Sequence, residues 1–457
     1  MVKYSTLAAA SLLGTAQAMA LPKSMSLAVR GAYGNNTIVH PTPANEVTDK
    51  TLILTPETTL NSTSGSSIKD APGAPLSLSF VNNFAGGSTV NAYLVGTDPN
   101  GQVVFLKPDG TYYNPPNPDA GASGPTQVDA ASIAIPLGAV GSTTTVSLGE
   151  YISSGRIYFS AGDLYFAVNH GDAGPNLVQP NPGNTQDPSA GLNWGFAEFT
   201  WNAQQLFANI SYVDFVGLVI GMMLTETSGA TQQAQGLPAE AVTTICQALQ
   251  QQAAADGQPW DQLCVTDTSG NPLRILSPNQ LVALGVGGPF QDYWTDYVNQ
   301  VYDSFASTPL TINTQGDAGD VQGTYNAGTG NIEFANGGSF SKPGALDIFG
   351  CNSGPFANSG DAAHLAIVAR LCAAFNRSTL LLSGGSTQPN GVTDTTQYYS
   401  TAPTNYYSKF VHSTEIDGRG YAFAYDDVHG DSGADLAGTV NAGDPQSLTV
   451  VVGGPSA

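Results

Sequence analysis

The chain has 457 residues, more than one ordinary domain holds, and this length suggests two or three structural units. It carries 13 Lys and Arg against 35 Asp and Glu, which gives a formal net charge of −22. We expect no nucleic acid and no anionic membrane as partner, because binding to phosphate needs cationic side chains that displace counterions. A neutral or cationic partner is compatible with this charge, as is an acidic surface that serves only solubility.

The first 20 residues have the pattern of a secretory signal peptide. They place a lysine before a short apolar run and end in two small-x-small cleavage sites. No later stretch reaches the roughly 20 uninterrupted apolar residues of a membrane-spanning helix. We therefore expect a secreted protein, extracellular or in a cell wall, with a pro-segment or spacer over residues 21–74. Four glycosylation sequons agree with this route: Asn35, Asn61, Asn209 and Asn376.

Short alternating runs broken by turn residues begin at Leu76 and predict the strands of an all-β unit. Clear examples are LSLSFVNN at 76–83, TVNAYLVG at 89–96 and RIYFS at 156–160. The turns DPNG and PDG predict tight hairpins between such strands. Similar runs reappear far along the chain as STLLLSG, GRGYAFAYDD and SLTVVVG, at 378–384, 418–427 and 447–453.

Between these regions the apolar period changes to that of helices. In PAEAVTTICQAL, at 238–249, four apolar residues fall on one helical face after a proline. Two more helices are predicted over 290–305 and 361–375. We therefore predict a mainly β protein. Its β-sandwich or barrel domain is formed by 75–225 and 386–457, and a mixed α/β unit is inserted over 226–385.

The chain has four cysteines, Cys246, Cys264, Cys351 and Cys372. An even number in an oxidising compartment predicts two disulfides. Three pairings are possible, and we expect the two short ones, Cys246–Cys264 and Cys351–Cys372, because each lies within one locally patterned segment. No CxxC motif or Cys/His cluster indicates a metal site, so we expect no metal.

Residues 197–217, AEFTWNAQQLFANISYVDFVG, contain two acidic side chains, Glu198 and Asp214. Strand alternation places Glu198, Thr200 and Asn202 on one face and the aromatic residues between them on the other. The eleven positions between Asn202 and Asp214 leave room for a loop and a returning strand. Both carboxylates would then share one surface.

Two carboxylates in a partly apolar cleft are the usual machinery of glycoside hydrolysis. One stays protonated and serves as the acid, which burial favours, and the other is ionised. The aromatic neighbours of Glu198 make it the better candidate for the protonated group. The alternative is that Glu198 is an exposed strand residue and that Asp214 caps a turn.

These segments resemble the thaumatin-like superfamily, whose members line an acidic cleft with R-I-W, A-E-F-T-L and D-I-S-x-V-D-G motifs. The chain has RIY at 156–158, AEFTW at 197–201 and ANISYVD at 208–214, in the same order. Asn209 stands where the plant proteins have a cleft aspartate. The segments DIFGCNSGPFA and ARLCAAFNRSTLL extend the resemblance to glycoside hydrolase family 64, over about residues 75–455.

The resemblance implies a thaumatin-like domain and an α/β domain that flank a wide acidic groove. It implies an endo-β-1,3-glucanase that cleaves β-1,3-glucan with inversion and releases short laminari-oligosaccharides, typically the pentaose. The general acid falls on Glu198 and the general base on Asp214. No cofactor is then needed, since an acid and a base suffice for acetal hydrolysis.

The resemblance also assigns substrate-binding positions. Thr200, Asn202 and Ser211 fall on polar positions of the family, and Phe207 falls where family enzymes have a tryptophan. Lys107 and Arg156 are further candidates, although a surface lysine that only covers the core is an alternative for Lys107. We expect a monomer. The competing function is a non-catalytic thaumatin-like protein that binds β-glucan at a cell wall.

Overall fold

The computed structural model describes residues 74–283, 288–316, 318–335 and 337–455. The expected signal peptide, the expected spacer up to residue 73 and the sequons at Asn35 and Asn61 lie outside the described residues. Within the described part, no helix is both long enough and apolar enough to cross a membrane.

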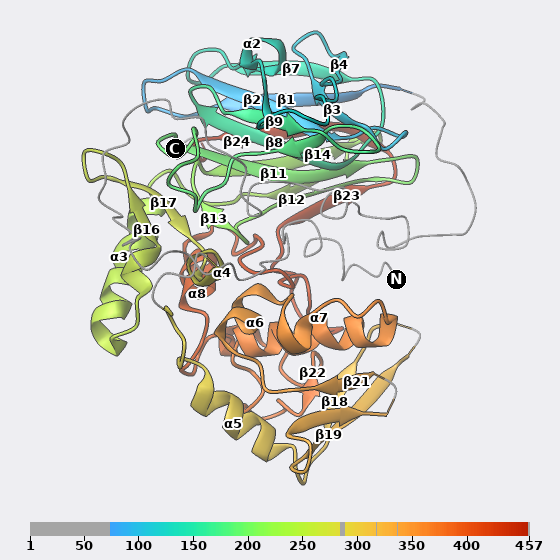
Figure 1. Cartoon of the computed structure of the whole chain (residues 1–457), viewed down its shortest axis with the longest axis vertical. Coiled ribbons are helices and arrows are strands. Elements are labelled where there is room, and N and C mark those ends of the chain that lie inside the picture. The colour runs from blue at the N-terminus through green and yellow to red at the C-terminus, as the bar shows by residue number, and fades with distance from the viewer. Residues whose placement is uncertain (1–73, 284–287, 317, 336, 456–457) are drawn as a thin grey trace.

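Two large sheets pack face to face in the upper half of Figure 1. The eight-stranded sheet has the order β23-β12-β11-β8-β2-β3-β4, and β6 pairs with β2. Its strands are β2 (Val90–Thr97), β3 (Val103–Leu106), β4 (Tyr112–Tyr113), β6 (Ile135–Pro136), β8 (Ile152–Ala161), β11 (Trp194–Trp201), β12 (Leu206–Ile210) and β23 (Thr439–Ala442). The five-stranded sheet has the order β15-β14-β24-β1-β7. It contains β1 (Leu76–Asn82), β7 (Thr143–Leu148), β14 (Ile220–Glu226), β15 (Thr231–Ala234) and β24 (Pro445–Val452).

The alternating sequence explains why these strands form a sandwich. In β1, every second residue of LSLSFVN is buried, and Phe80 packs edge-on against Phe159 of β8 at a ring distance of 5.3 Å. From β11, Phe199 and Trp201 belong to the same core. The face of β11 that carries these aromatic residues is therefore the sandwich interior, and the face that carries Glu198 is the opposite one.

A third layer covers part of that opposite face. It consists of β5 (Thr126–Val128), β9 (Phe166–Asn169) and β10 (Asn176–Val178), with the short helix α2 (Ala130–Ile133) nearby. Phe166 of β9 packs on Tyr93 and Phe105 of the eight-stranded sheet at ring distances of 5.5 and 5.4 Å. The cluster beneath this small sheet also includes Trp194 and Phe196 from the start of β11.

The inserted segment begins after β15 and contains both helices and strands. Next to the sandwich lie α3 (Ala241–Asp256), the 3-10 helix η1 (Trp260–Leu263), β16 (Cys264–Thr266), β17 (Pro272–Leu276), α4 (Pro278–Ala283) and α8 (Tyr406–Thr414). In the sheet β13-β17-β16, the short strand β13 (Phe215–Val216) comes from the sandwich part of the chain. The two parts of the chain therefore share backbone hydrogen bonds.

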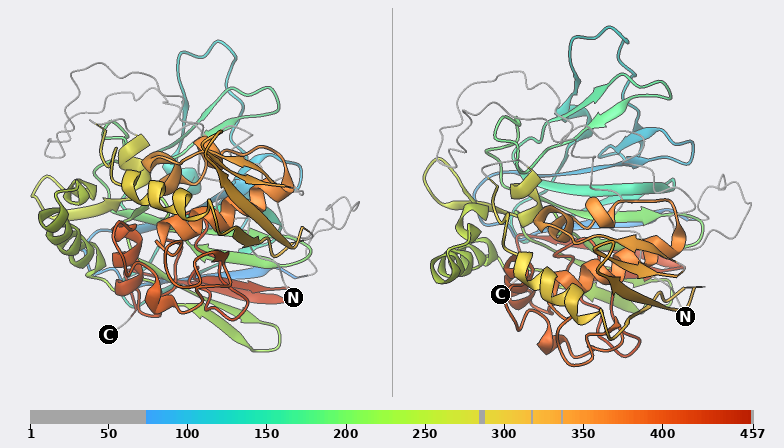
Figure 2. Two further views of the ribbon diagram at one scale, coloured as in Figure 1. Left: turned by 90° about the horizontal axis from the view of Figure 1, so that it is seen from below. Right: turned by 60° about the horizontal axis from the view of Figure 1, so that its bottom comes forward.

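A second lobe occupies the lower half of Figure 1. Its five-stranded sheet has the order β21-β20-β19-β18-β22. In Figure 1, α6 and α7 lie between this sheet and the sandwich, and α5 lies beside it; Figure 2 shows the same lobe from below. The elements are α5 (Thr295–Ser304), β18 (Leu310–Asn313), β19 (Asp320–Asn326), β20 (Asn331–Phe334), β21 (Gly338–Phe340), α6 (Ala345–Gly350), η2 (Gly354–Phe356), α7 (Ala362–Asn376), β22 (Thr387–Gln388) and η3 (Thr395–Gln397).

Both expected disulfides form. Cys246 of α3 is bonded to Cys264 of β16, and Cys351, directly after α6, is bonded to Cys372 of α7. Each links two elements of the inserted segment. The prediction from short sequence separation is thus confirmed.

Two sequence predictions about the fold are wrong. STLLLSG forms turns instead of a strand, with Leu380 buried and Leu381 exposed, and GRGYAFAYDD contributes only one isolated bridge, at Tyr421. Residues 231–234 still belong to the sandwich as β15, while only β23 and β24 rejoin it at the C-terminal end. The division of the chain at residues 226 and 386 stays a prediction, whereas the apolar runs at 378–384 and 418–427 were mistaken for strands.

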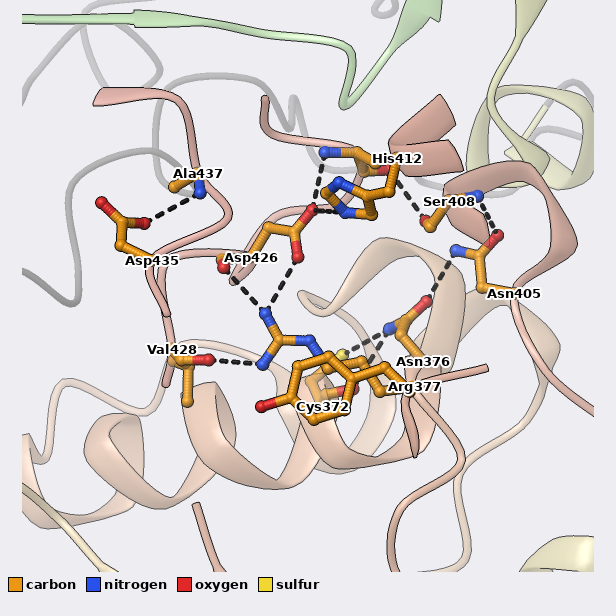
Figure 3. Close-up of polar contacts among 12 residues, drawn as sticks. Cys372, Asn376, Arg377, Asn405, Ser408, His412, Asp426, Val428, Asp435 and Ala437 are labelled. Carbon is orange, nitrogen blue, oxygen red and sulfur yellow. Dashed lines mark hydrogen bonds and ion pairs between the residues drawn. The ribbon is translucent and has the colours of Figure 1, made fainter. Parts of the chain in front are cut away.

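A buried ionic network holds the last part of the inserted segment (Figure 3). Arg377, directly after α7, donates to the Asp426 carboxylate at 2.9 Å and to the Val428 carbonyl. His412 of α8 bonds Asp426 at 2.8 Å through Nε2 and Glu415 at 2.9 Å through Nδ1. The network therefore ties α7 and α8 to the chain around Asp426.

Two sequon asparagines lie in the described part of the chain. Asn209 is 2% exposed and Asn376 is fully buried, where its amide donates to the Ile348 and Cys372 carbonyls. Neither side chain is accessible to a glycan on the folded chain.

Candidate active site

Register in the eight-stranded sheet places three polar side chains in one row. Glu198 of β11 lies opposite Arg156 of β8 on one side and opposite Asn209 of β12 on the other. Residues directly opposite each other in neighbouring strands point to the same face. The row therefore lies on the face turned away from the sandwich interior.

Glu198 is buried and paired. It is 8% exposed, its Oε1 lies 3.4 Å from Arg156 Nη2, and the Asn209 side chain hydrogen-bonds it. Burial raises its pKa, Arg156 counteracts this, and the negative charge of Asp214 raises it further. The expected burial is thus present, but Phe199 and Trp201 do not cause it because they face the sandwich interior.

Asp214 lies in a bend just before β13, not within a strand as the alternation predicted. It is 6% exposed, and its Oδ1 accepts a 2.9 Å hydrogen bond from Gln280 Nε2 of α4. Burial raises its pKa, while Arg156 and the Gln280 bond lower it. The carboxylate thus comes from the sandwich part of the chain and its hydrogen-bond donor from the inserted segment.

Arg156 is the cation shared by both carboxylates. Its guanidinium lies 4.7 Å from the Phe196 ring centre and 3.4 Å from the Tyr158 hydroxyl. Burial alone would lower its pKa, but Tyr158, Glu198 and Asp214 raise it above its usual value. Arg156 therefore remains charged and limits how far the carboxyl pKa values rise.

Thr200 and Asn202 follow Glu198 along β11. The Thr200 hydroxyl accepts from the Ser154 backbone at 3.2 Å. Asn202 lies beyond the strand end, where its side-chain oxygen accepts from the Gln204 and Gln205 backbones at 2.9 and 3.0 Å. It lies four positions after Glu198, past a register shift between Phe199 and Trp201. Asn202 thus builds the β11–β12 hairpin, at a distance from the carboxylates.

Ser211 and Phe207 lie on the β12 side of the site. Ser211 is 3% exposed, and its hydroxyl has no hydrogen-bond partner among the described residues. Its backbone forms a bridge with Tyr421 of the returning chain. Phe207, opposite Thr200, is 8% exposed. A buried ring of this kind offers little surface on which a sugar can stack.

Lys107 does not join this group. It follows β3, which is separated from β11 by β8 and β2, and its ammonium lies 3.5 Å from Asp109 of the same hairpin. Asp163 lies beyond the end of β8, and its carboxylate accepts from Asn91 at 2.9 Å. Lys107 and Asp163 thus pair outside the row that contains Glu198.

Sequence reasoning missed Gln280. It lies 66 positions after Asp214, and it reaches Asp214 because β13 pairs with β17 directly before α4. A signal was present in the sequence, since Ser277-Pro278 marks a helix start. That signal places a helix but does not show which strand it approaches.

This arrangement can transfer protons in two directions. A buried carboxyl with a raised pKa can donate a proton, and a second carboxylate held by an amide and an arginine can accept one. Among the described residues, no group of three or more His, Cys, Asp or Glu side chains could hold a metal ion. The two carboxyl groups are suited to acid–base catalysis by their own chemistry.

Known proteins with similar sequences support this interpretation. The chain is 26% identical over 359 residues to a glucan endo-1,3-beta-glucosidase of Cellulosimicrobium cellulans. It is equally identical over 355 residues to one of Arthrobacter sp. (strain YCWD3). The matches cover 76% of this chain and 60% of each relative, so the chain spans less than two thirds of their length.

Solved structures have a similar fold. A laminaripentaose-producing beta-1,3-glucanase in complex with laminaritetraose superposes with a TM-score of 0.71 at 28% identity, over 83% of this chain and 99% of that one. A beta-1,3-glucanase domain from Clostridium beijerinckii gives 0.64 at 23% identity, over 84% and 99%, which supports the fold alone. The family model described as beta-1,3-glucanase matches residues 74–452. The chain therefore belongs to glycoside hydrolase family 64, the family of β-1,3-glucanases.

Proposed function

We propose that the protein is an endo-acting hydrolase of β-1,3-glucan. The observation that carries this proposal is the pair of buried carboxylates, Glu198 and Asp214, with Arg156 interacting with both. In this proposal Glu198 is the general acid that protonates the leaving oxygen. Asp214 is the general base that takes a proton from water as the water attacks the anomeric carbon.

Family membership supports inversion of configuration and the release of short laminari-oligosaccharides, with the pentaose as the expected main product. Inversion requires about 6.5–9.5 Å between the two carboxyl groups, enough for a water molecule. The substrate would lie in a groove between a thaumatin-like sandwich and the inserted segment. Arg156 would bind near the cleaved bond, and Thr200 and Ser211 would line the neighbouring sugar positions. Asn202 would contact a sugar farther from the carboxylates, and Phe207 would line the groove without stacking on a sugar.

Ser211 supports the substrate side of this proposal. A buried hydroxyl without a partner in the described residues is costly, and a sugar hydroxyl or a water can satisfy it. We expect Lys107 to contribute little, since it pairs with Asp109 outside the carboxylate group.

We further infer that the chain is secreted and acts as a monomer without a cofactor. The signal-peptide pattern, two disulfides and a net charge of −22 support an extracellular or cell-wall location and a neutral polysaccharide as the partner. The same charge argues against nucleic acid and anionic membranes as partners.

The test is incubation of the purified chain with linear β-1,3-glucan, with product lengths followed by chromatography. The proposal predicts soluble oligosaccharides of a few units that appear before glucose. Binding to insoluble glucan without any release of oligosaccharide would instead identify a non-catalytic glucan-binding protein. Linear β-1,4-glucan serves as the control polysaccharide and should remain intact.

A further inference from the structure

The inserted segment holds Asp214 at two points. Gln280 Nε2 donates to Asp214 Oδ1 at 2.9 Å, and the Ser277 backbone amide donates to the Asp214 carbonyl, also at 2.9 Å. The next residue, Phe215, pairs with Leu276 in the β13–β17 ladder. Both the side chain and the backbone of Asp214 are therefore fixed by residues 276–280.

The helix that carries Gln280 is itself fixed. Its neighbours Asn279 and Leu281 are buried, and Leu281 lies in the main core. The helix packs closely on α6, since a Cβ added at Gly350 would lie 2.7 Å from Asn279 Oδ1. A donor on such a firmly packed helix is preorganised, so its hydrogen bond constrains the acceptor.

We propose that Gln280 is a positioning residue for the base: its amide orients the Asp214 carboxylate, so that the inserted segment contributes to catalysis. With Oδ1 bonded to Gln280, Oδ2 is the oxygen that takes the proton from water. This inference rests on the proposed function. It assigns a role to a residue that neither touches substrate nor exchanges a proton.

The charge balance around Asp214 explains why a neutral donor suits this position. The groups that face Asp214 are Arg156 and Tyr158 of β8, Glu198 of β11 and Tyr407 of α8. Burial raises the pKa of Asp214, and Arg156 and the Gln280 bond lower it. The amide therefore favours the ionised base without adding a second cation, which would also favour loss of the proton from Glu198.

The test compares Gln280→Leu and Gln280→Glu with the wild type on linear β-1,3-glucan. Gln280→Leu removes the donor at similar volume. It should lower kcat about 10- to 100-fold, the effect of losing one hydrogen bond to a charged group, with a smaller change in KM. The acidic limb of the pH profile should move to higher pH. Gln280→Glu keeps the shape but adds a carboxyl group, so it should move that limb further.

The control is Gln252→Leu. Gln252 of α3 donates to Asp256 at 2.9 Å, so this variant removes the same kind of bond at an exposed place in the inserted segment. It should match the wild type in kcat and pH profile. Circular dichroism and the melting temperature establish which variants are folded.

A second readout does not depend on activity. The measurement is carbon NMR of a chain labelled at the aspartate carboxyl carbons, in which Asp214→Asn identifies the Asp214 signal. Gln280→Leu should raise the pH at which this signal titrates. If the wild type is active and the folded Gln280 variants have its kcat, its acidic limb and its Asp214 titration, this inference alone is overturned. A wild type that leaves the glucan intact overturns the proposed function, and the catalytic role of Gln280 with it.

Discussion

Arg156 and Glu198 lie opposite each other on adjacent strands, with Arg156 Nη2 3.4 Å from Glu198 Oε1, and both residues are buried, at 9% and 8% exposed. The same guanidinium acts on Asp214. One cation thus sets the protonation of both groups assigned to catalysis. Removing Arg156 would leave the buried negative charge of the carboxylates uncompensated.

Arg156→Met should move both limbs of the pH–activity profile to higher pH. Burial already raises the carboxyl pKa values above their usual 4.5 and 3.8, and the loss of the cation raises them further. The acid then keeps its proton to higher pH, and the base becomes ionised only at higher pH. The profile of kcat/KM against pH measures both limbs. The two apparent pKa values that it gives describe the interacting pair and not either residue alone.

Arg156→Lys is the matched control, since it retains the charge but not the planar geometry. Its limbs should stay closer to those of the wild type than the limbs of the Met variant. Equal profiles in all three proteins would mean that Arg156 has no electrostatic role.

The stereochemistry of the product tests inversion. Proton NMR of the first products from linear β-1,3-glucan should show the α-anomer at the new reducing end, which then mutarotates. The β-anomer appearing first would preserve the hydrolase but contradict inversion. It would also require the carboxyl groups to stand only about 5–5.5 Å apart.

Loss of the Cys351–Cys372 disulfide should destabilise the inserted segment with little effect on the chemistry. The bond closes a loop with a sequence separation of 21 residues, for which chain entropy predicts a loss of about 3 kcal/mol. The double variant Cys351→Ala/Cys372→Ala should melt at a lower temperature. At low temperature it should retain kcat/KM on glucan. A loss of activity without a loss of stability would contradict the claim that this disulfide affects stability and not catalysis.

The buried His412 predicts a loss of stability at alkaline pH. Burial alone would lower its pKa, but Asp426 and Glu415 raise it to about 10 from 6.5. Between these values the folded state keeps its proton while the unfolded state releases it. Stability is therefore complete below about pH 6.5 and falls as pH rises towards 10, by at most about 1.4 kcal/mol per pH unit.

The measurement is the melting temperature from pH 6.5 to 10, compared with His412→Gln. At pH 6.5 the wild type should melt at a higher temperature than the variant, and this difference should shrink as pH rises. A difference in melting temperature that stays constant across this range would show that His412 does not remain charged in the folded chain.

Much of the site was predictable because it depends on local pattern. Alternation along AEFTW separates Glu198 and Thr200 from Phe199 and Trp201, as the structure confirms. The periodic segments that predict α3, α5 and α7 also form helices. Such features follow from neighbours a few positions apart.

The remaining features depend on contacts between distant segments. The partners of Asp214 come from β8 and α4, which the sequence pattern does not connect to it. STLLLSG was predicted as a strand from its apolar run, but it forms turns directly after α7. Leu380 is buried there without any pairing strand. Burial explains Leu380 but not Leu381, which is exposed, so the apolar run does not require a strand.

The most direct test of the account is the hydrolysis of linear β-1,3-glucan by Glu198→Gln and Asp214→Asn beside the wild type. Both variants preserve shape and remove one acid or base, so each should lower kcat by about 10²- to 10⁴-fold while still binding insoluble glucan. Gln252→Leu provides a folded control with full activity. Wild-type rates in either folded carboxyl variant would contradict the assignment of acid and base.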